Sequence, residues 1–184
     1  MSPWRLREAV RGLRAGGVVA YPTEAVYGLG CDPDNEQAVQ RLLTLKQRPL
    51  HKGLILIAAD FGQLTPYLDP LPVDRLSQVL QTWPGAATWL LPVAKSTPSW
   101  LTGGRDSLAV RVTAHPPARA LCLAWGSALV STSANPTGRP PARSALQVRR
   151  YFGSRVDAVL AAPLGGKARP TPIRDARSGA LVRA

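Results

Sequence analysis

The chain has 184 residues, 45% of them hydrophobic, which fits one folded domain and excludes an intrinsically disordered chain. No stretch is apolar for long enough to predict a membrane span, and residues 1–5 carry no apolar signal region, so we expect a cytoplasmic protein. The 23 Lys and Arg against 11 Asp and Glu give a net charge of +12, which predicts attraction to polyanions.

Helical and strand patterns alternate along the chain, and no internal repeat interrupts them. Helices are expected at residues 2–15, 34–46, 72–83, 116–125 and 144–152. Strands are expected at residues 18–21, 54–58, 87–91, 108–112 and 129–131, with short ones near Val159 and Leu181. The Pro- and Gly-containing stretches 92–104 and 163–172 are expected to be surface loops.

Two of these elements define the expected architecture. Ser2 is placed to cap the first helix, with Pro3 at its first helical position. The uninterrupted apolar run 54–58 is typical of a strand buried on both faces, near the middle of a sheet. These patterns predict an α/β fold, in which residues 1–184 form a single domain with a twisted mixed sheet flanked by helices.

A pair of cations follows the second predicted helix. Lys46 and Arg48 are two residues apart, just before the apolar run 54–58. On an extended segment, alternate side chains point the same way, so the two cations are expected to face one ligand. A planar arginine fork beside a mobile lysine charge suits phosphate. Most such pairs are nevertheless solvated surface charge, so this pair needs support from elsewhere in the chain.

Two further segments place small polar residues where strands are expected to end. Residues 131–136 read Ser-Thr-Ser-Ala-Asn-Pro and follow an apolar run, and residues 20–30 mix rigid, small and polar residues after the strand 18–21. Hydroxyl groups serve poorly in a core but donate and accept well beside a ligand. Open α/β sheets bind ligands in the crevice beyond their strand ends. Each segment alone reads equally well as an ordinary strand-to-loop turn.

Familiar catalytic and metal motifs do not fit the remaining polar residues. Cys31 and Cys122 lack metal-ligand spacing and are expected to be reduced, partly buried thiols. His115 precedes a helix start and is interpreted as structural, and His51 as an exposed loop residue. Residues 164–168 contain Gly-Gly-Lys but lack the spacing of a phosphate-binding loop.

Several separated motifs together resemble the YrdC-domain family, the threonylcarbamoyl-AMP synthases. That family shows Lys-x-Arg early and Ser-x-Asn late, which stand here at residues 46–48 and 133–135. Its Pro-Thr-(acid)-x-x-Tyr-Gly element stands at residues 22–28. The resemblance runs from about residue 16 to the C-terminus and is closest to the short bacterial members. Glu24 and Ala25 depart from the Asp-Thr that many members carry.

The resemblance implies a nucleotidyltransferase that forms threonylcarbamoyl-adenylate from L-threonine, bicarbonate or CO2, and ATP, with release of diphosphate. It also implies a basic concave ligand groove. Mg²⁺ is expected to arrive with ATP, without a dedicated metal site on the protein. The product is an unstable mixed anhydride, so partner proteins that pass the threonylcarbamoyl group to tRNA, giving threonylcarbamoyladenosine, are implied as well.

The resemblance assigns catalytic roles to four residues. Lys46 and Arg48 are expected to contact the phosphates and the carboxylated intermediate. Ser133 and Asn135 are expected to orient the α-phosphate. A site of this composition supplies positioning and charge stabilisation, which phosphoryl-transfer chemistry needs more than a strong base.

Four substrate contacts are implied around this catalytic group. Thr23 and Tyr27 are expected to line the threonine pocket, where a positioned hydroxyl and a phenol would recognise the substrate's carboxylate and hydroxyl. Ser131 and Arg174 are expected to contact the nucleotide, together with the catalytic residues. No residue is assigned to a metal.

Two other functions remain open at this stage. The first is a non-catalytic module that binds double-stranded or ribosomal RNA in ribosome assembly, because ten Lys and Arg between residues 139 and 183 face only Asp157 and Asp175. Arginine is also favoured in GC-rich genomes, and a triphosphate site needs a positive field of its own. The second is a domain that transfers a carbamoyl group from carbamoyl phosphate, which is chemically close.

Overall fold

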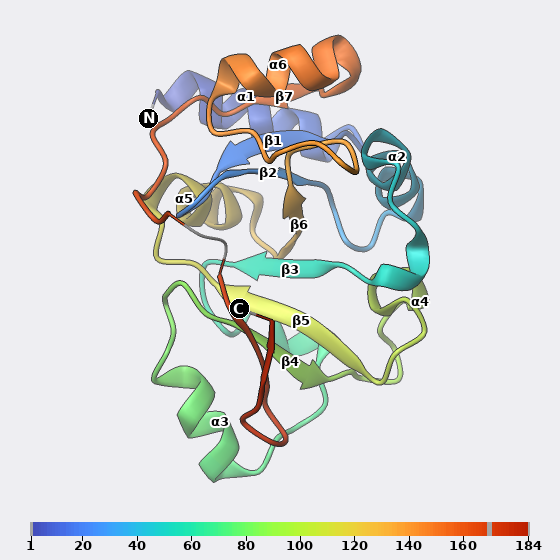
Figure 1. Ribbon diagram of the computed structural model, residues 1–184, viewed down its shortest axis with the longest axis vertical. Helices are drawn as coiled ribbons and strands as arrows, with labels where there is room; N and C mark the ends of the chain where they lie inside the picture. Colours follow the sequence, from blue (N-terminus) through green and yellow to red (C-terminus); the bar gives the residue numbers. More distant parts are fainter. Residues whose placement is uncertain (1, 169–170, 184) are drawn as a thin grey trace.

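The computed structural model describes residues 2–168 and 171–183, and these build one mixed sheet with helices on both faces (Figure 1). The sheet has nine strands in the order β7-β1-β2-β6-β3-β5-β4-β8-β9. In Figure 1, α1 and α6 lie at the top of the molecule, and α3 stands at the opposite end.

The elements alternate along the chain, as an α/β fold requires. The helices are α1 (Pro3–Arg14), α2 (Glu36–Lys46), α3 (Val73–Leu80), α4 (Ser99–Thr102), α5 (Pro116–Trp125) and α6 (Ala145–Phe152), with 3-10 turns η1 (Leu50–Lys52), η2 (Thr65–Tyr67) and η3 (Gly153–Arg155). The strands are β1 (Val19–Pro22), β2 (Tyr27–Gly30), β3 (Ile55–Ala58), β4 (Thr88–Pro92), β5 (Ser107–Val112), β6 (Leu129–Ser133), β7 (Ala158–Val159), β8 (Ile173–Asp175) and β9 (Leu181–Arg183).

Strand β6 lies between β2 and β3 and pairs with each of them over a different part of its length. Its first residues pair antiparallel with β3, where Ser131 lies opposite Ile55. Its last residues pair antiparallel with β2, where Ser133 lies opposite Gly28. Strands β2 and β3 thus pair with opposite ends of β6 on its two sides, and the place where these two ladders meet forms a fork in the sheet.

Apolar residues form two clusters, one on each face of the sheet. One cluster joins Val39 and Leu42 of α2 with Val148 of α6. The other joins Leu13 of α1 with Leu121 of α5. Each of these helices therefore buries one apolar stripe against the sheet, as an amphipathic helix does.

Most of the predicted elements are confirmed, including the central strand, since β3 is the fifth of the nine strands. The expected helix 72–83 is shorter and spans Val73–Leu80, with Val73 86% and Leu80 40% exposed. Ser2 precedes α1, yet its side chain makes no capping hydrogen bond. Part of the expected loop 92–104 is the short helix α4. Within the described residues, no helix has the length and apolar character that crossing a bilayer requires.

Two strands were not predicted. Strand β2 carries Gly28 and Gly30, and glycine is poor strand material. Here glycine is required, because a Cβ on Gly30 would lie 2.6 Å from the carbonyl oxygen of Val130. Strand β8 is only three residues long and follows the expected loop 163–172, so it has little pattern of its own.

Candidate active site

A cavity of about 360 Å³ opens at the fork between β2, β6 and β3. Its wall combines small hydroxyl residues, apolar strand residues and three arginines. The lining residues are Thr23, Ala25, Val26, Tyr27, Gly28, Arg48, Leu54, Ile55, Ile57, Thr88, Arg111, Ser131, Thr132, Ser133, Pro141, Thr171 and Arg183. Five of the predicted site residues are among them, namely Thr23, Tyr27, Arg48, Ser131 and Ser133.

The predicted cations lie close together, but not on an extended segment. Lys46 is the last residue of α2, and Gln47 turns the chain with a φ of 53° in the left-handed region. The expectation that the two side chains point the same way along a strand is therefore wrong. Such a turn is a common way to end a helix, and it leaves Lys46 buried on the helix while Arg48 reaches the cavity.

Lys46 contacts the segment that follows β6. Its Nζ donates to the carbonyl oxygens of Ser133 and of Asn135, the latter at 2.9 Å, and lies 3.4 Å from Asn135 Oδ1. Burial, followed by the charge of Arg48, lowers the pKa of Lys46 to about 8. The two family motifs predicted from the sequence, Lys-x-Arg and Ser-x-Asn, are thus in direct contact.

Arg48 lies on the loop that leads to β3. Its Nη2 donates to the carbonyl oxygens of Gly53 at 2.9 Å and Lys52 at 3.3 Å. Arg105 donates to the same loop from outside, through the carbonyls of Lys52 and His51 at 3.1 and 3.0 Å. Burial lowers the pKa of Arg48, and the charges of Arg183 and Arg105 lower it further. Within residues 2–168 and 171–183 no acidic side chain forms an ion pair with Arg48, so its positive charge at the cavity wall is not neutralised by that part of the chain.

Thr23 and Tyr27 lie at the cavity wall, but their hydroxyl groups already have main-chain partners. Thr23 Oγ1 donates to the carbonyl of Val26 at 2.8 Å. Tyr27 Oη donates to the carbonyl of Ala162 at 2.7 Å and accepts from its amide at 3.2 Å. In this arrangement the two residues shape the wall, and their hydroxyls hold the backbone rather than point at an empty space.

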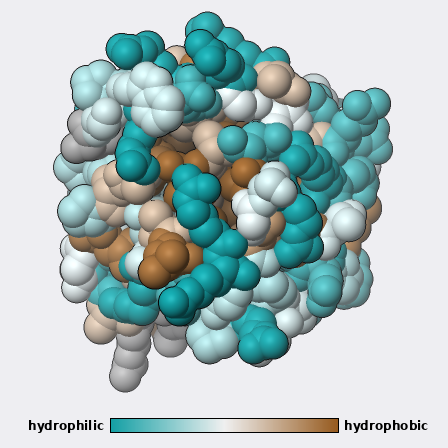
Figure 2. All heavy atoms as spheres, turned by 90° about the horizontal axis from the view of Figure 1, so that it is seen from above, coloured by the Kyte–Doolittle hydropathy of each residue, from teal (hydrophilic) through white to brown (hydrophobic). Residues whose placement is uncertain are grey.

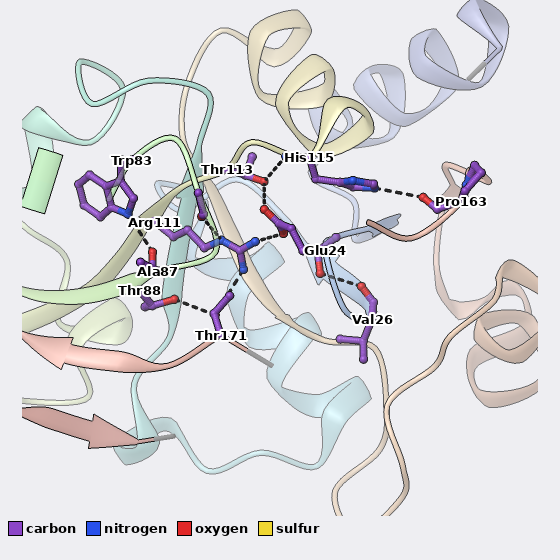
Figure 3. A network of polar contacts seen from close by, with 12 residues as sticks. Glu24, Val26, Trp83, Ala87, Thr88, Arg111, Thr113, His115, Pro163 and Thr171 are labelled. Atoms are coloured by element: carbon purple, nitrogen blue, oxygen red, sulfur yellow. Dashed lines mark hydrogen bonds and ion pairs between the residues drawn. The ribbon is translucent and has the colours of Figure 1, made fainter. Parts of the chain in front are cut away.

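A buried ion pair forms one end of the cavity, and the sequence did not reveal it (Figure 3). Arg111 of β5 pairs with the carboxylate of Glu24, which also accepts a hydrogen bond from Thr113 at 2.8 Å. Arg111 further donates to the carbonyl of Gly85 at 3.2 Å and reaches Thr171 at 3.4 Å. Burial lowers the pKa of Arg111 to about 10, so this guanidinium stays protonated at neutral pH.

Residues 160–168 and 171–172, which lie between β7 and β8, pass along this end of the cavity. The amides of Gly165 and Lys167 donate to the carbonyls of Thr23 and Glu24 at 3.1 and 2.9 Å. The ring of His115, which is buried, contacts the carbonyl of Pro163 at 3.1 Å (Figure 3). The burial of His115 and its contact with the main chain agree with the structural interpretation. The Gly-Gly-Lys segment lies against Thr23 and Glu24 through its main-chain amides. Residues 169–170 of the expected loop lie outside the described residues.

Arg174, a predicted nucleotide contact, is not brought to the cavity, and Arg183 is. Arg174 is exposed on β8, and its Nη1 lies 3.4 Å from the carbonyl of Gly179. Ile173 pairs with Arg183 of β9, and residues opposite each other across two strands share one face of the sheet. A register shift follows directly, with Arg174 opposite Leu181, so the regular alternation of side chains is interrupted between Ile173 and Arg174.

The remaining sequence expectations concern the cysteines and His51. Cys31 and Cys122 are both fully buried free thiols, more buried than expected. Burial raises the pKa of both, so neither is a reactive thiolate at neutral pH. His51 is exposed on η1, as expected for a loop histidine.

Comparisons with known proteins agree with the fold and cover nearly the whole chain. The family model for the Sua5/YciO/YrdC domain, described as "Telomere recombination", matches residues 11–184. A protein of Halorhodospira halophila named threonylcarbamoyl-AMP synthase is 62% identical over 181 residues, which are 98% of this chain and 95% of the relative. A Nitrosococcus oceani protein of the same name is 57% identical over 180 residues, 98% of this chain and 97% of the relative.

A solved structure gives the same result in three dimensions. The structure of P. abyssi Sua5 complexed with L-threonine superposes with a TM-score of 0.85 at 34% identity and covers 95% of this chain. This chain spans 52% of that longer one. The matches in sequence and in structure lead to one conclusion: the chain belongs to the Sua5/YciO/YrdC family.

Proposed function

We propose that the protein is a threonylcarbamoyl-AMP synthase, which joins L-threonine, bicarbonate or CO2, and ATP, and releases diphosphate. The observation that carries this proposal is the cavity at the β2-β6-β3 fork, whose arginines and hydroxyls suit a phosphorylated ligand. High identity to proteins named for this activity supports it. The alternative function, transfer of a carbamoyl group from carbamoyl phosphate, has less support, because both relatives are named threonylcarbamoyl-AMP synthase.

The reaction needs two bond-forming steps. The amine of threonine takes up CO2 with loss of a proton, or bicarbonate with loss of water, to give a carbamate. A carbamate oxygen then attacks the α-phosphorus of ATP while the bond to the β-phosphate oxygen breaks, and diphosphate leaves with the electron pair. Negative charge grows on the phosphate oxygens, so fixed positive charges aimed at them lower the barrier.

The cavity offers separate surfaces for the two substrates. We assign Arg48, Ser131, Ser133 and Arg183 to the nucleotide, because guanidinium and hydroxyl groups there face the same space. The two arginines would make this cavity the basic ligand groove that the family resemblance implies. The wall with Thr23, Ala25 and Tyr27 is assigned to threonine, with apolar and main-chain surface rather than free hydroxyls as its contribution.

Magnesium is proposed to enter as part of the MgATP substrate. Within the described part of the chain, the cavity lining contains hydroxyl groups but no carboxylate, and the Glu24 carboxylate is held by Arg111 and Thr113. Mg²⁺ commonly keeps several waters and binds mainly through substrate phosphates. These residues therefore fit a metal carried by ATP better than one held by the protein.

Diphosphate release tests the proposal directly. The protein is incubated with MgATP, threonine and bicarbonate, and each component is omitted in turn. Release that requires all three supports the synthase. Release that does not depend on threonine, or that requires carbamoyl phosphate, contradicts it. Arg149→Gln serves as a matched control, because it removes one exposed arginine charge on α6 and is expected to leave release unchanged.

An RNA contact is proposed as an accessory property, because α1 and α6 carry many exposed arginines at one end of the molecule. In Figure 2, which views the molecule from above, hydrophilic side chains cover most of this face around a smaller apolar area. Replacing both Arg149 and Arg150 with Gln should weaken RNA retention and lower its salt dependence, by about one unit of slope for each lost phosphate contact. A parallel loss of diphosphate release would show that the two surfaces are not separate.

The mixed-anhydride product hydrolyses readily, so we also propose partner proteins that accept it and transfer the threonylcarbamoyl group to tRNA. A useful test adds such transfer enzymes and tRNA to the synthase reaction and follows threonylcarbamoyladenosine in the RNA. Its formation only when the synthase and its three substrates are present supports this order of steps.

A further inference from the structure

The ammonium group of Lys46 has a protein oxygen for each of its three N–H donors. The acceptors are the carbonyl oxygen of Ser133, the carbonyl oxygen of Asn135 at 2.9 Å, and Asn135 Oδ1 at 3.4 Å. An ammonium has three donors and no acceptor, so this set of partners uses its full capacity. Lys46 is also only 4% exposed. A phosphate would have to displace one of these oxygens to reach Nζ.

The main chain at Lys46 holds the same segment in return. Its carbonyl oxygen accepts hydrogen bonds from the amide and the hydroxyl of Thr137, both at 2.9 Å. The Thr137 hydroxyl also lies 3.0 Å from the carbonyl of Gln47. The end of α2 therefore binds residues 133–137 through two sets of hydrogen bonds. One set is made by the Lys46 side chain and the other by its main-chain carbonyl.

The side-chain amide of Asn135 is equally occupied. Its Oδ1 faces Lys46, while Nδ2 donates to the carbonyls of Pro136 at 3.0 Å and Arg139 at 2.7 Å. An asparagine amide has two N–H donors, and both have protein acceptors here. Asn135 thus fixes the shape of the turn that follows β6.

The other members of the two motifs have the opposite surroundings. Arg48 and Ser133 line the cavity, whereas Lys46 and Asn135 are absent from its described lining. Arg48 also keeps a buried Nε that has no partner within residues 2–168 and 171–183. Each motif therefore sends one residue into the cavity and one into the protein.

We propose that Lys46 and Asn135 are positioning residues, which lock residues 133–137 to the end of α2 so that Ser133 and Arg48 face one ligand. This division departs from the direct phosphate contact expected for Lys46 and Asn135 from the family resemblance. The effect of the lock on turnover rests on the proposed function, but the lock itself is a property of the free protein.

Amide hydrogen exchange tests the lock without any substrate. In Lys46→Met, which keeps the length and apolar stem of the side chain, the amides of Asn135 and Thr137 should exchange at least about tenfold faster than in the unchanged protein. Thr137→Val should act in the same direction. Arg48→Met is the matched control and should change these two rates by less than about twofold. Unchanged exchange in Lys46→Met would overturn the proposal.

Steady-state kinetics separate positioning from ligand binding. Lys46→Met and Asn135→Ala should each lower kcat by about tenfold or more, with the KM for ATP within about threefold. The double variant should lose less than the product of the two single losses, because both residues act on the same segment. Lys46→Met combined with Arg48→Met should instead multiply the two losses.

Nucleotide affinity supplies the outcome that contradicts the proposal. Titration compares ATP with adenosine for each variant. A direct contact between Lys46 and the phosphates of ATP predicts that Lys46→Met weakens ATP binding while adenosine binding persists. That result would show that Lys46 is not a positioning residue. If the unchanged protein releases no diphosphate, the proposed function fails instead, and the exchange rates still decide whether the lock exists.

Discussion

The cavity carries its positive charge in two different ways, and Arg111 and Arg48 show the contrast. Arg111 projects from a buried strand and is paired with the carboxylate of Glu24. Arg48 projects from a loop and donates to the neutral carbonyls of Lys52 and Gly53. Arg111 therefore contributes little net charge of its own, whereas the partners of Arg48 in the described part of the chain are neutral and leave its charge for a ligand.

This difference separates stability from activity. A buried ion pair is strongly damaged when one partner is removed, because the other charge is left without compensation. An arginine that touches only neutral carbonyls, within the part of the chain that is described, leaves no buried charge behind when it is replaced. We therefore expect the Arg111 side of the cavity to control folding and the Arg48 side to control the reaction.

The largest expected effect is a loss of stability when the buried Glu24–Arg111 ion pair is broken. Glu24→Gln keeps the shape of the side chain but leaves the Arg111 charge unpaired, and it should lower the free energy of unfolding by about 3–5 kcal/mol. Urea denaturation measures this. The control is Asp106→Asn, which breaks the exposed pair with Arg177 and should have a much smaller effect. Equal losses in the two variants would remove the distinction between the buried pair and a surface pair.

The second effect is on catalysis. Arg48→Met should reduce kcat/KM for ATP by an amount equivalent to about 2–4 kcal/mol of transition-state stabilisation. Its urea midpoint should stay close to that of the unchanged protein. Diphosphate release and denaturation are measured on the same preparation. A variant that loses stability but keeps its turnover would reverse the roles given to the two arginines.

A smaller effect is expected at Tyr27. Tyr27→Phe removes the two hydrogen bonds to Ala162 and should lower the free energy of unfolding by about 1–3 kcal/mol. The KM for threonine should change by less than about twofold, because the phenol is already occupied by the main chain. A clear rise in the threonine requirement would restore the direct recognition role that the sequence suggested.

The smallest effect is a pH dependence at Lys46. Its pKa is lowered from 10.5 to about 8 in the folded protein, so between these values the unfolded chain binds more protons. The free energy of unfolding should therefore rise with pH in this window, by on the order of 1–2 kcal/mol between about pH 7 and 9.5. Denaturation curves of the unchanged protein and of Lys46→Met are compared, and the variant should lack this rise. Parallel curves would show that Lys46 titrates normally.

The sequence predicted the elements whose pattern is local. The apolar run of β3 and the helical spacing of α2 and α5 needed no knowledge of their neighbours. The extended reading of residues 46–48 failed because a single left-handed residue, Gln47, turns the chain. Strand β2 was missed because its glycines serve a close approach to β6, and only the pairing reveals that need.

The candidate site was predicted in part for the same reason. The resemblance of the Lys-x-Arg and Ser-x-Asn motifs predicted Arg48 and Ser133 as site residues, and both line one cavity in the structure. Arg111 was read simply as part of a strand, and its partner Glu24 is far away in the chain. An arginine among Leu108, Val110 and Val112, together with an acid directly after a buried strand, is a usable signal for a buried ion pair. The sequence does not say which acid meets which arginine.

The segment between β7 and β8 also determines how one edge of the sheet is covered. It carries the chain from β7, at one edge, to β8, which pairs with β4 near the other. Without β8 and β9, the backbone groups of β4 next to Trp89 and Leu90 would form an open edge beside apolar side chains. Open edges of this kind invite pairing between molecules. The hairpin that brings Arg183 to the cavity therefore also covers the edge of β4 with β8, and it makes β9 the outer strand on this side of the sheet.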